Sequence, residues 1–497
     1  MNSQVLIVGA GPVGLTMAAE LARYGVSVRI VDKSGQRTDK SKAVVLWSRT
    51  LELLDRAGCT DAFVASGNTV DAANIITGKT VIGHVDFSSV GSPYPFALML
   101  PQSDTERLLE EHLGLLGINT QRQTELFSFE QDSSGVTAIL KSADGQEEVV
   151  KADWLIGCDG AHSAVRHGLG LSFLGNTLQS DWILADLHLS GYPLPTSEMA
   201  TYWHEDGVLL IIPMSATRFR IIADLGLSTG GPPVNPTLDQ VQAIIDSRGP
   251  GGMTTSNPIW LSAFRINERK VSDYRAGRVF VVGDAAHVHS PAGGQGMNTG
   301  MQDAFNLAWK LALVCRGEST EAMLDSFSIE RSAIGAEVLK AAGRLTMVAT
   351  MRNHTAQAVR NLLGRLLLGL APVRKAMVDT MSEVSVGYDH SPLNGPDLHR
   401  SDIPAPGRRL EPIAMQTPVG SGKAPRFALF AAGNVEVSEL ATRFPNLIDA
   451  EIRAPLYPGV ILLARPDGYV ACVAKSDHPI VIADYLEAID VAKAEAA

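Results

Sequence analysis

Residues 4–32 read QVLIVGAGPVGLTMAAELARYGVSVRIVD, and this stretch decides the fold. A continuous apolar run from Val5 to Val8 leads into a glycine-rich turn. Apolar residues then recur at helical spacing, and a second apolar run ends at Asp32. The pattern predicts a strand, a tight turn, a helix and a second strand, which is the beginning of an α/β fold.

The glycines of this turn have the spacing of a dinucleotide-binding fingerprint. Gly9 permits the sharp turn, Gly11 lets a pyrophosphate approach the backbone, and Gly14 allows close packing of helix on strand. The free N–H groups of the helix that follows the turn face the phosphate. Asp32 stands where a carboxylate accepts hydrogen bonds from a ribose. A lone GxGxxG is weak evidence, but the strand, helix and acid around it together predict a nucleotide site.

Composition limits the remaining possibilities. The 497 residues suggest two or three domains, and the net charge of −11 argues against nucleic acid or an anionic membrane as the main partner. The four cysteines lie far apart and form no CxxC, so we expect neither a disulfide framework nor a metal site. No signal-peptide pattern opens the chain, and the apolar stretch 362–373 is too short to span a bilayer. We expect a cytoplasmic protein without stable membrane association.

The pattern along the chain predicts several segments. Alternating strands with one helix indicate an α+β lobe with helices on one side of a largely antiparallel sheet. A cluster of prolines between the later helices and the last segment indicates a linker. The expected segments are 1–171 with an excursion to the second lobe at about 70–100, the second lobe at 172–275, a return to the first lobe at 276–395, the linker at 396–424, and a last domain at 425–497.

The last domain has the order strand, helix, strand, hairpin, helix, which resembles a thioredoxin-like domain. The redox cysteine pair of that fold is missing, so we do not expect disulfide exchange. We expect the domain to serve in packing or in dimer contacts, and a homodimer is an open alternative for the oligomeric state.

Two further glycine-bearing strand ends follow the first, CDGAHSAVR at 158–166 and GDAAHVHSPAGGQGMNTGMQDA at 283–304. Together the three motifs resemble the single-component flavin-dependent aromatic hydroxylases of the p-hydroxybenzoate hydroxylase type. The RPDGYV run at 465–470 and the last domain are most similar to the phenol hydroxylase branch. The resemblance covers essentially the whole chain. It implies a Rossmann-like FAD-binding lobe, an α+β substrate lobe and a C-terminal thioredoxin-like domain.

The resemblance also implies an activity. An FAD-dependent monooxygenase of this type hydroxylates a phenolic or other electron-rich aromatic substrate with O2 and NAD(P)H, through a flavin C4a-hydroperoxide. The basic loop 33–42 favours NADPH over NADH, because a 2′-phosphate needs a cationic partner. Alternatives are a flavin halogenase, an oxygenase acting on a carbonyl compound, and a non-catalytic flavin-binding protein. The halogenase is disfavoured because the WxWxIP pattern of that family is missing.

Individual residues take roles from the resemblance. Asp284 is placed to accept hydrogen bonds from ribityl hydroxyls, and Pro291 to form a wall beside the reactive carbon of the flavin. The N–H groups of Met297 and Asn298, at a helix N-terminus, would stabilise negative charge on the reduced flavin. The cofactor-binding residues so predicted are Gly9, Gly11, Pro12, Gly14, Asp32, Lys33, Arg49, Gln102, Asp159, Asp284, Pro291, Gly294, Gly296, Met297 and Asn298.

Several of these residues have a second, structural interpretation. Arg49 and Gln102 match family positions near the flavin or its phosphates, but each also stands at the start of a helix. Asp159 belongs to the motif that links FAD and nicotinamide functions in the family, and it is also a good capping residue. His287 and His289 have no third metal ligand nearby, which favours structural roles.

A base that activates the phenol is harder to place. Tyr202, His204 and Arg220 lie on predicted strands of the second lobe, and the sequence does not decide which face of each strand points inward. The predicted catalytic residues are Pro291, Arg49, Tyr202 and His204.

Overall fold

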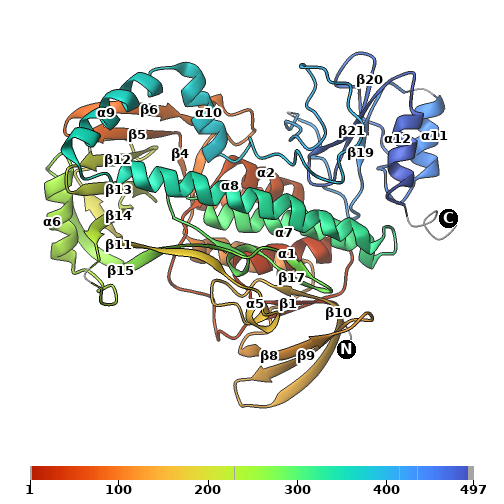
Figure 1. Ribbon diagram of the computed structural model, residues 1–497, viewed down its shortest axis with the longest axis horizontal. Coiled ribbons are helices and arrows are strands. Elements are labelled where there is room, and N and C mark those ends of the chain that lie inside the picture. Colours follow the sequence, from red (N-terminus) through yellow and green to blue (C-terminus); the bar gives the residue numbers. More distant parts are fainter. Residues whose placement is uncertain (1–2, 229, 414, 434, 491–497) are drawn as a thin grey trace.

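The first lobe is an α/β layer built on the parallel strands that the fingerprint predicts. The computed structural model describes residues 3–228, 230–413, 415–433 and 435–490 (Figure 1). The central sheet has the order β16-β17-β10-β1-β2, and β17, β10, β1 and β2 run parallel. Its strands are β1 (Ser3–Val8), β2 (Val28–Val31), β8 (Thr124–Gln131), β9 (Val136–Ser142), β10 (Glu147–Gly157), β16 (Arg275–Ala276) and β17 (Val279–Val281).

The turn after β1 is as tight as its glycines predict. Gly9 has φ 101°, and a Cβ on it would lie 2.4 Å from the carbonyl oxygen of Cys158. A Cβ on Gly14 would lie 1.9 Å from the carbonyl oxygen of Gly9. These contacts let α1 (Pro12–Arg23) pack closely on the strand ends and on α7 (Gly296–Cys315).

Other helices of this lobe and a small sheet connect it to the second lobe. The small sheet has the order β3-β7-β4. Figure 1 shows α8 running along α7 through the middle of the molecule. These elements are β3 (Val45–Leu46), β4 (Asn68–Val70), β7 (Ala97–Met99), α2 (Ser48–Ala57), α3 (Thr60–Ser66), α4 (Gln102–Leu115), α5 (Ala164–Gly168) and α8 (Asp325–Ala349), with short 3-10 turns η1 (Phe87–Ser89), η2 (Gly283–Ala285) and η3 (Glu321–Leu324).

The second lobe is an eight-stranded, largely antiparallel sheet with the order β18-β15-β11-β14-β13-β12-β5-β6. The excursion expected at about 70–100 supplies β5 and β6 at one edge. The strands are β5 (Ala72–Thr77), β6 (Thr80–Asp86), β11 (Leu174–Ser190), β12 (Glu198–His204), β13 (Gly207–Pro213), β14 (Arg218–Leu227), β15 (Thr254–Lys270) and β18 (His287–Val288).

Helices cover both faces of this sheet, so the expectation of helices on one side is wrong. Helix α6 (Leu238–Arg248) packs on one face. Helices α9 (His354–Leu368) and α10 (Ala371–Met381) lie over the other face near β6 (Figure 1). Both faces of the central strands are apolar, so each face requires a cover. Among the residues described, no helix is long and apolar enough to cross a membrane.

The C-terminal domain has the expected order of elements except for one strand. Between α11 and the hairpin, the described residues form only the isolated bridges Phe427–Ile448 and Phe430–Arg453, so the strand expected there is wrong. A three-stranded sheet, β19-β20-β21, packs against two helices. Its elements are β19 (Ala428–Phe430), α11 (Val435–Arg443), β20 (Val460–Ala464), β21 (Val470–Lys475) and α12 (Ile480–Glu487). The thioredoxin-like assignment stays a prediction, and residues 491–497 lie outside the described part.

The prediction of a linker at 396–424 is wrong. The N–H groups of Gly407 and Leu410 donate to the carbonyl oxygens of Val470 and Gly468, at 2.8 and 2.9 Å. Ile403 and Leu410 are buried in the core of the C-terminal domain. The prolines prevent a regular strand, but the apolar residues between them still bury their side chains. This segment is therefore an irregular layer of the C-terminal domain.

The turn after β1 gives a stability prediction. We expect Gly14→Ala to lower the free energy of unfolding by about 1–3 kcal/mol, because the added methyl meets a backbone oxygen that cannot move aside. The matched control is Gly114→Ala in α4, where an added Cβ has no atom within 4 Å. That variant should gain about 0.5–1 kcal/mol from the reduced backbone entropy of the unfolded chain. Chemical denaturation of both variants checks the difference, and equal stability would contradict the packing described.

Candidate active site

The three glycine-bearing motifs meet at one edge of the first sheet. Strands β1, β10 and β17 are parallel neighbours, so their carboxyl ends lie together. Arg166 Nη1 donates to the carbonyl oxygen of Ala285 at 3.0 Å, which joins the second motif to the third. Gly9 and Cys158 are in van der Waals contact, which joins the first to the second. The edge is the crevice in which α/β sheets bind ligands.

The fingerprint turn leaves its outer side free. A Cβ placed on Gly11 has no atom within 4 Å, so the backbone there is open to an approaching group. Asp32 Oδ2 accepts a hydrogen bond from Ala10 N at 2.7 Å, and Oδ1 accepts one from Ser34 N at 2.7 Å. The half-buried carboxylate thus stabilises the turn, and its remaining lone pairs are available to accept hydrogen bonds from a ribose. Lys33 is exposed beside it.

Asp284 is an acceptor without a partner. Its side chain is exposed, and no described residue donates a hydrogen bond to its carboxylate. Surrounding protein raises the pKa of Asp284 above its ordinary value by desolvation, against the opposing charges of His287 and Lys42. The carboxylate is therefore accessible to a ligand, although protein surrounds it. Gly283, with φ 62°, holds the turn close to Val13.

The N-terminus of α7 supplies donors. The first helical hydrogen bond runs from Thr299 N to Gln295 O, so the N–H groups of Gly296, Met297 and Asn298 have no helical acceptor. Gly294 before them has φ 66°, and a Cβ on it would lie 3.2 Å from Val45. The loop and the helix end thus present backbone donors with positive dipole character.

The Asn298 side chain has a separate, structural task. Its Oδ1 accepts a hydrogen bond from Trp47 N at 2.9 Å, and its Nδ2 donates to Val45 O at 2.9 Å and to Gly294 O at 3.0 Å. Asn298 therefore fixes β3 and the glycine loop against each other. Pro291 is exposed, and its carbonyl oxygen accepts from Gly294 N at 2.9 Å. Its place beside a flavin stays a prediction.

The structure gives Asp159 its capping role. Asp159 Oδ1 accepts from Ser163 Oγ at 2.5 Å, and Oδ2 accepts from Ala164 N at 2.6 Å, at the start of α5. Gln102 Oε1 accepts from Ala43 N at 3.2 Å, and its Nε2 donates to Glu106 at 2.9 Å. Gln102 thereby fixes the loop before β3. Direct contact of either residue with a cofactor stays a prediction.

Arg49 is held at the contact with the C-terminal domain, and no contact in the described part of the chain joins its side chain to the three motifs; its assignment to catalysis and cofactor binding stays a prediction. The side chain is 3% exposed. Its Nη1 donates to Glu52 at 2.9 Å and its Nη2 to the carbonyl oxygen of Asp467 at 2.6 Å, and it stacks on Tyr469. The guanidinium is therefore committed to the C-terminal domain, a partner that no local pattern indicates.

The packing of Tyr202 opposes its assignment as a base, which stays a prediction. Its side chain packs with Val241 and Ile245 beneath α6, on one face of the sheet, whereas the next residue, Trp203, points to the other face under α9. Burial raises the pKa of Tyr202 to about 12, and its hydroxyl has no partner among the described residues. A phenol so placed does not reach the three motifs.

His204 and Arg220 have different surroundings. His204 lies beside the β12–β13 turn, where its Nδ1 accepts from Asp206 N at 3.2 Å, and no contact in the described part joins it to the three motifs. His204, Glu205 and Asp206 bring possible ligand atoms within 4.8 Å of one another, but both acids are exposed, and the absence of a metal stays a prediction. Arg220 pairs with Asp186 at 2.7 Å and donates to Lys42 O at 2.9 Å. Arg220 therefore joins the second lobe to the loop before β3. Because its guanidinium is paired with Asp186, it does not act as a base.

Sequence reasoning missed Asp303, which lies beneath the third motif. Its carboxylate accepts from Gly283 N at 3.2 Å and from Arg331 Nε at 2.6 Å, and lies 2.8 Å from His287 Nε2. The structural interpretation of His287 is thereby confirmed. Burial lowers the pKa of His289 to about 4, so that ring is neutral. The local hint of the network was that this buried helix carries charged residues, Asp303 and Lys310, among its apolar ones.

Comparison with known proteins identifies the chemistry of the site. The model of a family described as FAD binding domain matches residues 2–342. A 6-methylpretetramide 4-monooxygenase of Streptomyces rimosus is 34% identical, and the alignment covers 98% of this chain and 93% of that protein. The chain belongs to the FAD-dependent aromatic monooxygenases. The predicted family, the FAD-binding α/β fold and the aromatic monooxygenase activity are confirmed.

Further relatives agree with this assignment. The solved anhydrotetracycline hydroxylase of Streptomyces rimosus superimposes on the monooxygenase with a TM-score of 0.81 at 28% identity, over 99% of both chains. The pentachlorophenol 4-monooxygenase of Sphingobium chlorophenolicum is 32% identical over 68% of this chain and 63% of its own length. The residues of the site fit FAD, because an unpartnered carboxylate, free helix N–H groups and an open glycine turn lie at one sheet edge.

Asp284 gives the sharpest test of cofactor binding. We expect Asp284→Asn to weaken FAD binding by about 1.5–3 kcal/mol, because a charge-assisted hydrogen bond is lost. Glu125→Gln, an exposed carboxylate on β8, is the matched control and should leave the affinity unchanged. Titration of each purified variant with FAD, followed by fluorescence, gives the affinity. Equal affinity for Asp284→Asn and the wild type would show that Asp284 does not touch the cofactor.

Proposed function

We propose that the monooxygenase hydroxylates a large, flat, phenolic polycycle of the aromatic polyketide kind. The supporting observation is an apolar layer between the two lobes, called here the methionine layer. Its methionines are Met99, Met199, Met214, Met377 and Met381. They come from the small sheet, the second lobe and α10, so the layer joins elements of both lobes.

The methionine layer adjoins the glycine loop of the site. Trp47 belongs to the layer, and its Nε1 donates to the carbonyl oxygen of Gly293 at 2.9 Å. Met377 and Met381 on its rim are only partly buried. Unbranched methionine side chains rearrange at low cost and pack well against aromatic rings. These properties suit a broad aromatic ligand better than a single small ring, and two relatives named above act on polycyclic substrates.

Within this proposal, the residues of the chain orient the cofactor and the substrate and protect the reacting ring from water. FAD, when bound, supplies the oxygen chemistry together with a nicotinamide. The N–H groups of Met297 and Asn298 stabilise negative charge at the helix end, Asp284 holds a polyol, and Pro291 limits access from solvent. The methionine layer excludes water from the reacting ring.

The experiment compares ligands of increasing size. NAD(P)H oxidation by the purified enzyme is measured with phenol, with a hydroxylated naphthalene and with a hydroxylated four-ring quinone. We expect the KM to fall by about tenfold or more from one ring to four, since each ring adds buried apolar area. Mass spectrometry should show one added oxygen. Equal KM values, or turnover of phenol alone, would refute the proposed substrate class.

The finer cofactor assignment is also part of the proposal. NADPH is preferred, and the cations that support it are Lys33 and Lys40, which are exposed near the fingerprint turn. Arg37 pairs with Glu110 at 3.2 Å and is therefore less available to bind a 2′-phosphate. The ratio of kcat/KM for NADPH and NADH measures the preference, which Lys33→Ala should reduce by about threefold or more because an exposed cation contributes modestly. A ratio of one in the wild type would remove this assignment.

A homodimer in the cytoplasm completes the proposal. The four cysteines are free thiols, which agrees with a reducing compartment. Sedimentation of the purified enzyme tests the oligomeric state.

The glycine loop gives a prediction on coupling. Gly294→Val should slow flavin reduction and release more hydrogen peroxide per NAD(P)H, because a β-branched residue is strained at φ 66° and crowds Val45. Gly251→Val is the matched control, since Gly251 has φ 84° but open surroundings in the second lobe. Peroxide and hydroxylated product are measured side by side. Normal rate and coupling in Gly294→Val would place the reactive edge elsewhere.

A further inference from the structure

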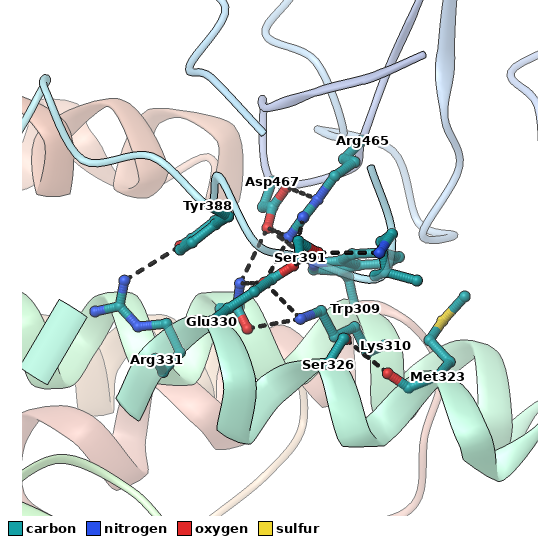
Figure 2. A network of polar contacts seen from close by, with 12 residues as sticks. Trp309, Lys310, Met323, Ser326, Glu330, Arg331, Tyr388, Ser391, Arg465 and Asp467 are labelled. Carbon is teal, nitrogen blue, oxygen red and sulfur yellow. Dashed lines mark hydrogen bonds and ion pairs between the residues drawn. The ribbon is translucent and has the colours of Figure 1, made fainter. Parts of the chain in front are cut away.

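The loop between β20 and β21 carries charged residues into the interior of the FAD-binding lobe (Figure 2). Arg465 is completely buried, and its Nη1 and Nη2 donate to the two carboxylate oxygens of Glu330 on α8, at 2.7 and 3.0 Å. Its Nε donates to Asp467 Oδ1 at 3.0 Å. A bidentate pair of this kind fixes orientation as well as distance.

The same loop also holds α7 and α2. Trp309 Nε1 on α7 donates to Asp467 Oδ2 at 3.0 Å (Figure 2). On α2, Arg49 donates to the carbonyl oxygen of Asp467 at 2.6 Å, and Arg56 donates to the carbonyl oxygen of Pro466 at 2.6 Å. The short segment 465–467 therefore contacts three helices of the other lobe.

The residue after Glu330 continues the connection toward the site. Arg331 Nε donates to Asp303 Oδ1 at 2.6 Å, and its Nη2 donates to the carbonyl oxygen of Thr299 at 3.1 Å, in the first turn of α7. Asp303 in turn accepts from Gly283 N, next to Asp284. Glu330 and Arg331 are adjacent, so a rotation or shift of α8 moves both contacts together.

We propose that Arg465 and Asp467 are positioning residues for the flavin site, acting through Glu330–Arg331 and Trp309 on the Asp284 loop and on the N-terminus of α7. In this assignment the C-terminal domain contributes to cofactor binding, although no contact in the described part of the chain joins its residues directly to the three glycine-bearing motifs.

The local charge balance explains why Arg465 matters. Lys310 Nζ also donates to Glu330 Oε2 at 2.7 Å, but burial lowers the pKa of Lys310 to about 8, against the attraction of Glu330. Without Arg465, Lys310 would be the remaining cation in contact with Glu330, and the Asp467 carboxylate would keep only the neutral donors Trp309 and Asn306. Two buried carboxylates with insufficient partners rearrange or take up a proton, and either response changes the position of α8.

The test uses the full-length holoenzyme. We expect Arg465→Gln to raise the Kd for FAD by about tenfold or more, since a buried charged hydrogen-bond pair is lost, and to change the visible circular dichroism of the bound flavin. Arg465→Lys keeps the charge and loses the bidentate geometry. Its Kd for FAD should lie between the values of the wild type and of Arg465→Gln. Arg400→Gln is the matched control, because Arg400 pairs with Asp402 on the surface of the same domain, at 2.6 Å. A folded Arg465→Gln enzyme with the wild-type Kd would overturn the proposal.

A milder variant separates positioning from general stability. Trp309→Phe removes only the hydrogen bond to Asp467 and keeps an aromatic ring in place. We expect a two- to fivefold rise in the Kd for FAD, about what one hydrogen bond contributes, together with altered visible circular dichroism. If Arg465→Gln fails to fold, this variant decides. A lower melting temperature with unchanged FAD affinity and spectrum would mean that the loop only stabilises the fold.

Discussion

The ion pair between Asp303 and Arg331 is the contact on which the flavin-binding lobe depends. Both side chains are fully buried, and the two groups lie 2.6 Å apart. Burial alone would favour the neutral acid, but Arg331 and His287 outweigh that effect and lower the pKa of Asp303. The carboxylate is therefore ionised at neutral pH, and it holds the backbone of Gly283 and the ring of His287 at fixed positions. The geometry of the Asp284 loop follows from this buried charge.

The features that the sequence predicted well are those whose causes are local. The turn at Gly9–Gly14 needs a positive φ and the absence of a Cβ, and the glycines of this short stretch meet both requirements. The Asp284 turn and the α7 N-terminus are predictable for the same reason. The presence of strands in the second lobe was also predictable, because alternation of apolar residues reports burial directly.

Other features depend on partners far away in the chain. Arg49 meets Asp467 across 418 residues, so no window around Arg49 distinguishes a cofactor ligand from a domain contact. Tyr202 needed a decision between two sheet faces that are both apolar, and alternation does not make that decision. The proline-rich segment near Pro404 was taken for a linker because its apolar residues, such as Ile403 and Leu410, are too widely spaced to form a recognisable strand.

Buried ion pairs are a costly way to join two domains. Removing charges from water requires several kcal/mol per ion, on the order of what their mutual attraction returns, so apolar residues of similar size would join the domains at least as firmly. The network around Glu330 and Arg465 is therefore poorly explained by stability alone. Charged, bidentate contacts fix a single orientation, because a rotated carboxylate loses its hydrogen-bond partners at once. Apolar contacts do not fix orientation in this way. The segment 465–467 meets α2, α7 and α8, and α7 and α8 also carry Asp303 and Arg331, whose contacts hold the Asp284 loop. A fixed orientation at one end of these rigid helices determines the position of their other ends, which is the property that a cofactor site needs.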